Sequence, residues 1–508
     1  MKLFFKSLVT IIICLLCLPI FSFSNTKTGI INAFIQRSTK DIDYSSYFGG
    51  YDLDRIEDVI ADSTGNFYIV GSTKSCDLPI NKAFQESNKG GTDAFVAKFN
   101  LSMDIEWLTY IGGDSEDFGT SLCLSPDEST LYIAGYTDSY CTFLPDHTKI
   151  LKDNITPKKG WCGFFVAFNS DGDIQDSILL GGSFDDGFFD IKCNKEDVFI
   201  VGSTHSSTIF PNVQSTLPNS NLSLDGIIIS LNRSTFSLNW YSFLGGRYDD
   251  RILSIALDNS NLYVTGTTSS DDFPIINAPQ HEKKANDFSI FYSCWDLEGN
   301  IEISTYMNAG MWSEGLDIQV DDDFNAYICG FTHNFDGSFV FTNWYTGKTD
   351  SKLSPCDSYV MKIDINGNII WTTGFSYSRL TSLQCLSNGK IVAAGWATGY
   401  FPITEETSFQ KENHGSVDSV IIALSPHGEL LFSSWWGGSG KSDKALSITI
   451  NHNSQQFGIV GQTDSQDFPI TKNAFMDNNT SELSGTIVLV SIDFLDRLTL
   501  EKNKPPKN

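Results

Sequence analysis

Short apolar segments alternate along the chain with polar stretches that contain glycine, and this pattern predicts β-strands rather than helices. In the first clear example, four segments rich in β-branched and aromatic residues are each bounded by Gly, Asn, Asp or Pro. They span residues 57–62, 67–72, 94–99 and 105–111. After residue 30 the sequence has no stretch of helical periodicity long enough to compete with this interpretation. We therefore expect an all-β protein.

The unit of four segments occurs seven times at a nearly constant spacing. Its clearest marker is a glycine in the second segment, and successive marker glycines are 64 to 67 residues apart. A Gly-Gly pair before the first segment and a Phe-Pro or Leu-Pro pair after the second recur in the same order, which identifies a repeat architecture. The marker glycines are Gly71, Gly135, Gly202, Gly266, Gly330, Gly395 and Gly461.

The repeat predicts a seven-bladed β-propeller of four-stranded antiparallel blades. Segments such as 95–99 and 227–231 are apolar at consecutive positions, as expected for strands that neighbouring blades cover on both faces. A glycine inside a strand indicates that another group packs closely against it. We interpret this group as a side chain of the adjacent blade; the alternative is an ordinary glycine at a strand end.

The first strand of the propeller is predicted to complete the last blade. Residues 42–48 resemble the outermost strand of a blade that lacks its other three strands. The final unit supplies only three, at 445–450, 457–462 and 486–492. Pairing of 42–48 with the third of these would close the ring and remove the exposed edges of an open one.

These motifs together resemble the seven-bladed beta-propeller repeat (SBBP) family. The resemblance covers about residues 42 to 493, and its members' activities are mostly undefined, so it implies a fold rather than a function. The residues that carry it in the first unit are Tyr44–Gly50, Asp62–Thr73, Leu78-Pro79 and Asp93–Lys98.

The N-terminus has the features of a secretory signal peptide. Lys2 and Lys6 precede an apolar run from Leu8 to Phe21, and small serines follow it. The run is short for a membrane span, and no later segment is apolar for long enough to be one. We therefore expect a secreted, periplasmic or cell-surface protein. Its predicted parts are a signal peptide (1–24), a lead-in (25–41), the propeller (42–493) and a C-terminal tail (494–508).

The charge of the chain bears on its partners. A formal net charge of −27 at pH 7 argues against binding to nucleic acid or to anionic membranes. It is compatible with cation binding, and also with a merely solvated acidic surface. Cys141 and Cys162 lie in the enlarged loop region of the second blade and could form a disulfide after export. We expect a monomer that binds a protein or a glycan.

An acidic residue follows the Gly-Gly turn, or its degenerate counterpart, in six units. If these carboxylates all faced the central channel, they could hold a hard cation such as Ca²⁺. Alternatively, each accepts backbone N–H bonds in a turn. The pattern favours the turn role, because a feature of nearly every blade meets a need that every blade has. The residues are Asp54, Asp117, Asp186, Asp250, Glu314 and Asp443.

Catalytic signatures are absent from the sequence: it has no Gly-x-Ser-x-Gly, no His-Glu-x-x-His and no phosphate-binding glycine loop. We therefore expect an exported, non-enzymatic scaffold that binds protein or carbohydrate partners through its loops, the longest being 140–163 and 333–356. Two alternatives stay open. One is a polysaccharide hydrolase or lyase with carboxylates at the channel mouth, and the other is a purely architectural envelope component.

Overall fold

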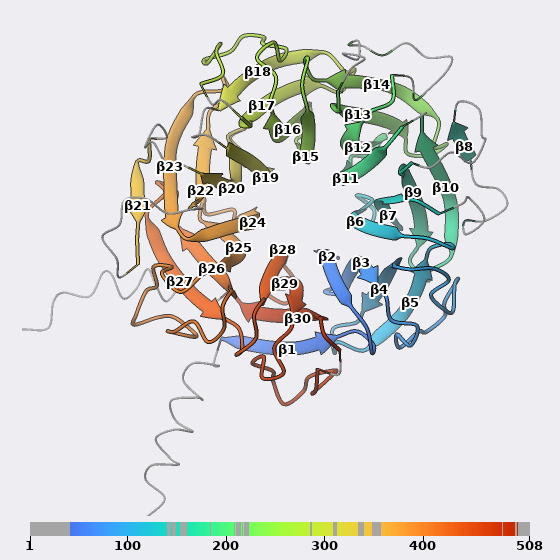
Figure 1. The fold of residues 1–508 in the computed structure, drawn as a ribbon, viewed down its shortest axis with the longest axis vertical. Coiled ribbons are helices and arrows are strands. Elements are labelled where there is room, and N and C mark those ends of the chain that lie inside the picture. The colour runs from blue at the N-terminus through green and yellow to red at the C-terminus, as the bar shows by residue number, and fades with distance from the viewer. Residues whose placement is uncertain are drawn as a thin grey trace, which may run out of the picture. The chain divides into compact units, whose positions relative to one another are not determined.

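The strands of the protein form seven sheets arranged as the blades of a ring (Figure 1), as a computed structural model shows. The predicted seven-bladed, all-β propeller is thereby confirmed. Among the described residues, no helix has the length and apolar character needed to cross a membrane. The predicted signal peptide, all of the lead-in but Asp41, and all of the tail but Leu495 lie outside the described residues. The structure describes residues 41–492 and Leu495, except for 140–143, 145–148, 153–159, 183, 208, 210–214, 216, 218–222, 285–286, 308–311, 334–339, 348–356 and 480.

Each blade begins with its innermost strand, and successive strands pair antiparallel outward from the channel. Blades one to three consist of β2 (Asp54–Ala61), β3 (Phe67–Thr73), β4 (Asp93–Phe99) and β5 (Ile105–Ile111); β6 (Asp117–Leu124), β7 (Thr130–Thr137), β9 (Cys162–Asn169) and β10 (Ile174–Gly181); and β11 (Asp186–Cys193), β12 (Asp197–Thr204), β13 (Asp225–Asn232) and β14 (Leu238–Leu244). Blades four and five consist of β15 (Asp250–Leu257), β16 (Asn261–Thr268), β17 (Ser289–Asp296) and β18 (Ile301–Met307); and β19 (Trp312–Val320), β20 (Ala326–His333), β22 (Asp357–Ile363) and β23 (Ile369–Ser376). Blades six and seven consist of β24 (Ser378–Cys385), β25 (Ile391–Ala397), β26 (Asp418–Leu424) and β27 (Leu430–Trp436); and β28 (Lys444–Asn451), β29 (Gln456–Thr463), β30 (Ser484–Ser491) and β1 (Ile42–Phe48).

The hydrophobic core lies between the blades. All seven residues of β4 are buried, because neighbouring blades cover both faces of such a middle strand. One core cluster joins Val70 and Val96 of blade one to Phe164 and Val166 of blade two.

The ring closes as the sequence predicted, with β1 as the outermost strand of the seventh blade. β1 pairs antiparallel with β30, placing Tyr44 opposite Leu489. Tyr47 is fully buried at this seam. Its hydroxyl donates to the carbonyl of Ser465 at 3.1 Å and accepts the N–H of Phe468 at 2.9 Å.

Two blades have a fifth strand that the sequence did not predict. In the enlarged loop of blade two, β8 (Lys149–Lys152) pairs parallel with β10. In blade five, β21 (Asn343–Tyr345) pairs parallel with β23. Parts of the two longest loops therefore extend the sheets at the rim of the ring.

The marker glycines have a different cause from the one predicted. Every innermost strand has a β-bulge opposite the marker glycine of the second strand, as between Ile56 and Asp58. A Cβ added to Gly71 would lie 2.1 Å from the carbonyl oxygen of Arg55, and the corresponding distance is 1.9–2.2 Å at all seven markers. The group that excludes a side chain is thus a carbonyl of the same blade. The prediction that a side chain of the adjacent blade packs against each marker glycine is wrong.

The antiparallel order places two sets of loops on one face of the ring. The Gly-Gly turns between blades, such as 49–53, and the loops between second and third strands, such as 74–92, both follow a strand that runs toward this face. We call it the Gly-Gly face. The tight hairpins, such as 62–66, lie on the opposite face, which we call the hairpin face.

Candidate functional site

Five of the predicted acidic residues bind the turn that precedes them. Oδ2 of Asp54 accepts the N–H of Gly50 at 2.7 Å and the hydroxyl of Ser75 at 3.1 Å, while its other oxygen accepts the hydroxyl of Thr73. Burial is the main cause that raises the pKa of Asp54 to about 6. The four other carboxylates are also buried and accept the equivalent N–H at 2.7–2.8 Å; they are Asp117, Asp186, Asp250 and Asp443.

Glu314 does not occupy the equivalent position. Ser313 pairs with Thr332 in the register in which Asp54 pairs with Thr73, and the Oγ atoms of Ser313 and Thr332 lie 2.8 Å apart. Glu314 is the next residue, so grouping it with the five aspartates was wrong by one position. The sequence concealed the shift because this unit has lost the Gly-Gly pair that precedes each of the five aspartates.

The cation and disulfide predictions remain predictions. Within the described residues, no group of three or more His, Cys, Asp or Glu side chains is arranged to hold a metal ion. Cys162 is buried in β9, whereas Cys141 lies outside the described residues.

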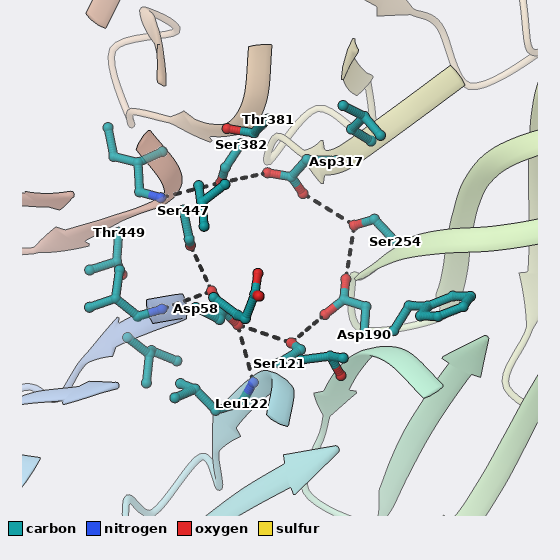
Figure 2. Close-up of a pocket in the computed structure, with 18 of the residues that line it drawn as sticks. Asp58, Ser121, Leu122, Asp190, Ser254, Asp317, Thr381, Ser382, Ser447 and Thr449 are labelled. Carbon is teal, nitrogen blue, oxygen red and sulfur yellow. Dashed lines mark hydrogen bonds between the residues drawn. The ribbon is translucent and has the colours of Figure 1, made fainter. Parts of the chain in front are cut away.

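The central channel contains a ring of side chains that the sequence reasoning missed. The innermost strands of all seven blades line a cavity of about 290 Å³. The first residue after each bulge is Asp or Ser, and these side chains meet around the channel (Figure 2). The signal was present in the sequence, because each lies four residues after the start of its strand, or after Ser313 in blade five and Asp443 in blade seven. In order of the blades they are Asp58, Ser121, Asp190, Ser254, Asp317, Ser382 and Ser447. We call them the channel ring.

Hydrogen bonds connect the channel ring from blade to blade. Each carboxylate bridges the serines of its two neighbouring blades, with oxygen–oxygen distances from 2.6 to 3.1 Å. Ser382 and Ser447 are adjacent, and here the N–H of Ile448 donates to Oγ of Ser382 at 3.3 Å. The ring therefore ties together the inner strands of all seven blades.

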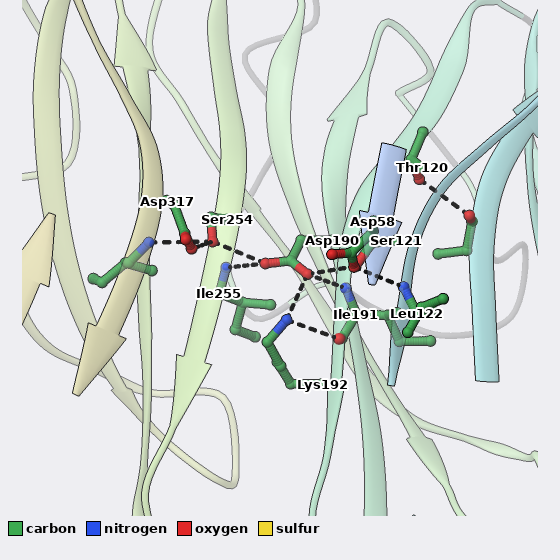
Figure 3. A network of polar contacts seen from close by, with 12 residues as sticks. Asp58, Thr120, Ser121, Leu122, Asp190, Ile191, Lys192, Ser254, Ile255 and Asp317 are labelled. Carbon is green, nitrogen blue, oxygen red and sulfur yellow. Dashed lines mark hydrogen bonds and ion pairs between the residues drawn. The ribbon is translucent and has the colours of Figure 1, made fainter. Parts of the chain in front are cut away.

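Asp190 is the member of the channel ring that forms an ion pair with a lysine (Figure 3). Its Oδ1 lies 2.8 Å from Nζ of Lys192. It also accepts the N–H of Ile191 at 2.8 Å and the N–H of Ile255 at 2.9 Å. Burial alone would lower the pKa of Lys192, but the carboxylates of Asp190 and Asp58 raise it above its usual range. Lys192 therefore stays protonated at neutral pH.

The other two carboxyl groups are positioned to hold protons. The ring has six contacts between serine and carboxyl oxygens, but four hydroxyls supply only four hydrogens. The remaining two contacts are hydrogen bonds only if carboxyl groups supply the hydrogens. Burial raises the pKa of Asp58, and burial together with the charge of Asp190 raises that of Asp317 to about 6.

Oδ1 of Asp317 is well placed to carry one of these protons. Among the described residues it contacts only Oγ of Ser254, at 3.1 Å, because the N–H of Ile318 donates to that serine instead. Oδ2 of Asp317 accepts from Ser382 and from the N–H of Leu383. A proton on Oδ1 therefore completes the hydrogen bonding of this part of the ring.

A second ring of side chains surrounds the mouth of the channel on the Gly-Gly face. Four of its seven members are basic, although the chain as a whole is strongly acidic. Burial and the nearby Arg55 and Arg379 lower the pKa of Lys444, so cationic groups crowd this part of the mouth. The members share one register position and are Arg55, Phe118, Gly187, Arg251, Glu314, Arg379 and Lys444. We call them the collar.

Comparison with known proteins shows no family for this chain. No protein-family description matches this sequence. A stretch of 195 residues is 27% identical to Regulatory protein FlaEY of Caulobacter vibrioides, covering 35% of this chain and 19% of that protein. The chain thus spans about a fifth of the length of this relative.

Solved structures with a similar fold have low sequence identity. Kuenenia stuttgartiensis hydrazine synthase has a TM-score of 0.42 at 7% identity, over 82% of this chain and 93% of that one. The Dos1 propeller has a TM-score of 0.42 at 9% identity, over 89% and 96%. Pyrococcus horikoshii acylaminoacyl peptidase has a TM-score of 0.41 at 10% identity, over 82% and 50%. These similarities concern the fold alone.

Proposed function

We propose that this protein is an exported, non-enzymatic scaffold that binds a protein or carbohydrate partner on its Gly-Gly face. The observation that carries the proposal is a set of exposed aromatic side chains on this face. Their exposed fractions range from 42% for Trp312 to 74% for Tyr51. Such rings supply contact area at low conformational cost. They come from five different blades and are Tyr51, Phe184, Tyr248, Trp312 and Tyr400.

The placement of charge supports a binding role over catalysis. The five buried turn aspartates and the channel ring form hydrogen bonds within the propeller. The collar presents basic groups on the same face as the exposed aromatic rings, so the Gly-Gly face offers both apolar contact and positive charge. Export is inferred from residues 1–24, and the resemblance of the repeats to the SBBP family fits a scaffold whose loops vary.

The proposal is tested by probing glycan and protein arrays with the purified protein. A saturable ligand is expected, and the double variant Tyr248→Ala/Trp312→Ala should weaken its binding at least tenfold. Ile365→Ala removes a comparably exposed side chain from the hairpin face and should leave binding unchanged. Equal binding by all three proteins, or no saturable ligand, would refute the proposal. Cleavage of an arrayed polysaccharide would favour the hydrolase or lyase alternative.

A further inference from the structure

We infer that a cleft above blade three on the Gly-Gly face binds a saccharide unit that carries a carboxylate, such as a uronic acid. The cleft has a volume of about 290 Å³. Its lining comes from three successive blades: Tyr136 and Trp161 from blade two, Asp185 and His205 from blade three, and Arg251 from blade four. The inference rests on the proposed function, since it assigns a ligand class to the same face.

Gly187 contributes to the space of the cleft because of its place in the collar. It is the only collar member without a side chain. A Cβ added here would meet Phe189 at 3.5 Å, an ordinary contact, whereas one added to Gly202 would lie 1.9 Å from a carbonyl oxygen. Packing therefore does not demand a glycine at position 187. Its absent side chain leaves room for a ligand.

The aromatic side of the cleft suits the apolar face of a sugar ring. The ring centroids of Tyr136 and Trp161 lie 5.3 Å apart at an interplanar angle of 77°, and Phe118 stacks on Tyr136 at 5.1 Å. Oδ1 of Asp185 accepts the backbone N–H of Trp161 at 3.0 Å, which holds this segment against the cleft. The wall is therefore preorganised, which reduces the cost of binding.

The opposite side of the cleft supplies an uncompensated positive charge. Two collar arginines are paired: Arg55 with Glu57 at 2.6 Å and Arg379 with Glu314 at 3.4 Å. Arg251 is exposed and has no ion-pair partner among the described residues. A guanidinium binds a carboxylate through two parallel hydrogen bonds. A ligand carboxylate could therefore pair with Arg251, as carboxylates of the protein pair with Arg55 and Arg379.

The surroundings favour a saccharide over an acidic peptide. Ends of strands line the cleft, and β12 is already paired on both edges, with β11 and β13, so an extended peptide finds no strand edge there. The polar side chains of Ser203, His205 and Asp185 include both donors and acceptors. Adjacent sugar hydroxyls require this mixture, because each can donate and accept.

The test measures the binding of galacturonic acid oligomers and of neutral galactose oligomers by titration calorimetry. We expect saturable binding of the acidic oligomers, with at least a tenfold preference that Arg251→Gln removes. Gly187→Leu should abolish binding by filling the cleft, without lowering the Tm. Arg247→Gln, which removes an exposed arginine of the same face that pairs with Asp272, is the matched control and should bind as the wild type does.

The outcomes separate this inference from the proposed function. Acidic oligomers that do not bind, or that bind Gly187→Leu as well as wild type, would overturn the saccharide site. An acidic peptide whose binding Gly187→Leu abolishes would also overturn it, since the ligand class would be wrong. An array ligand that depends on Tyr248 and Trp312, but not on Gly187 or Arg251, would overturn the inference and leave the scaffold standing.

Discussion

Replacing Asp317 by Asn should stabilise the propeller at alkaline pH and leave it almost unchanged in mild acid. An asparagine reproduces the protonated carboxyl group in the channel ring. Its amide N–H₂ can donate to Oγ of Ser254 where Oδ1 of Asp317 now lies, at 3.1 Å. Its carbonyl oxygen can accept the Ser382 hydroxyl and the N–H of Leu383, as Oδ2 does at 3.0 and 2.8 Å. The substitution thus preserves the contacts and removes only the ionisation.

The size of the effect follows from the raised pKa of Asp317. Burial first, and then the charge of Asp190, raise it from 3.8 to about 6. The folded protein therefore holds this proton more tightly than the unfolded chain. The resulting stability is fully present below pH 4 and is lost as pH rises through 6. A difference of about two pKa units corresponds to about 3 kcal/mol in the free energy of unfolding.

Urea denaturation of both proteins at pH 4 and pH 8 measures the effect. We expect Asp317→Asn to be within about 1 kcal/mol of wild type at pH 4 and about 3 kcal/mol more stable at pH 8. The matched variant Asp190→Asn should be destabilised at both pH values by about 3 kcal/mol, because it leaves Lys192 without its partner. That value is at the low end for a buried pair, since the Lys192 side chain is 30% exposed. The reasoning fails if Asp317→Asn is less stable than wild type at pH 8, or if its effect does not change with pH.

Three further predictions concern the turns, the bulges and the seam. Burial raises the pKa of Asp186 to about 6 and that of Asp250 to about 7. The wild type should therefore be at least about 3 kcal/mol more stable at pH 5 than at pH 8. A maximum of the unfolding free energy at pH 8 would contradict this. Gly71→Ala should lower the unfolding free energy measured by urea denaturation by about 3 kcal/mol, because the new methyl group overlaps a carbonyl oxygen. Gly187→Ala should lower it by less than about 0.5 kcal/mol. Equal losses in the two variants would refute the explanation of the marker glycines by the bulge. Tyr47→Ala should lower the unfolding free energy by about 3–5 kcal/mol, measured against Tyr51→Ala, and near-wild-type stability would show that β1 is not needed to close the ring.

The fold was predictable because each repeat contains glycine and proline residues that mark the ends of its strands. The seven marker glycines fixed the number of blades, and the missing fourth strand of the last unit located β1 in the seventh blade. The reason for the marker glycines was not predictable. A one-residue bulge, such as that between Ile56 and Asp58, leaves no pattern of hydrophobicity and becomes evident only from the pairing of strands.

The candidate sites were less predictable, because they depend on neighbours from different repeats. Asp58 and Asp317 look like ordinary polar residues of half-exposed strands until the ring brings serines of other blades beside them. Nothing in the sequence marks Gly187, because its significance is the space that it leaves beside side chains of other blades. Glu314 was misplaced by one residue because Ala309-Gly310 replaces the Gly-Gly pair in this unit and no longer fixes the register.

The odd number of blades has a consequence for the channel ring. Two residue types can alternate perfectly around a circle only when its membership is even, so seven positions must contain one mismatch. Two neighbouring aspartates would repel, whereas two neighbouring serines merely lack a carboxylate between them. The mismatch is Ser382 beside Ser447, at the border of the seventh blade. That blade is also the one assembled from both ends of the propeller sequence. The weaker hydrogen bonding in the channel and the non-covalent pairing of β1 with β30 therefore both belong to the seventh blade, and we expect this blade to separate first.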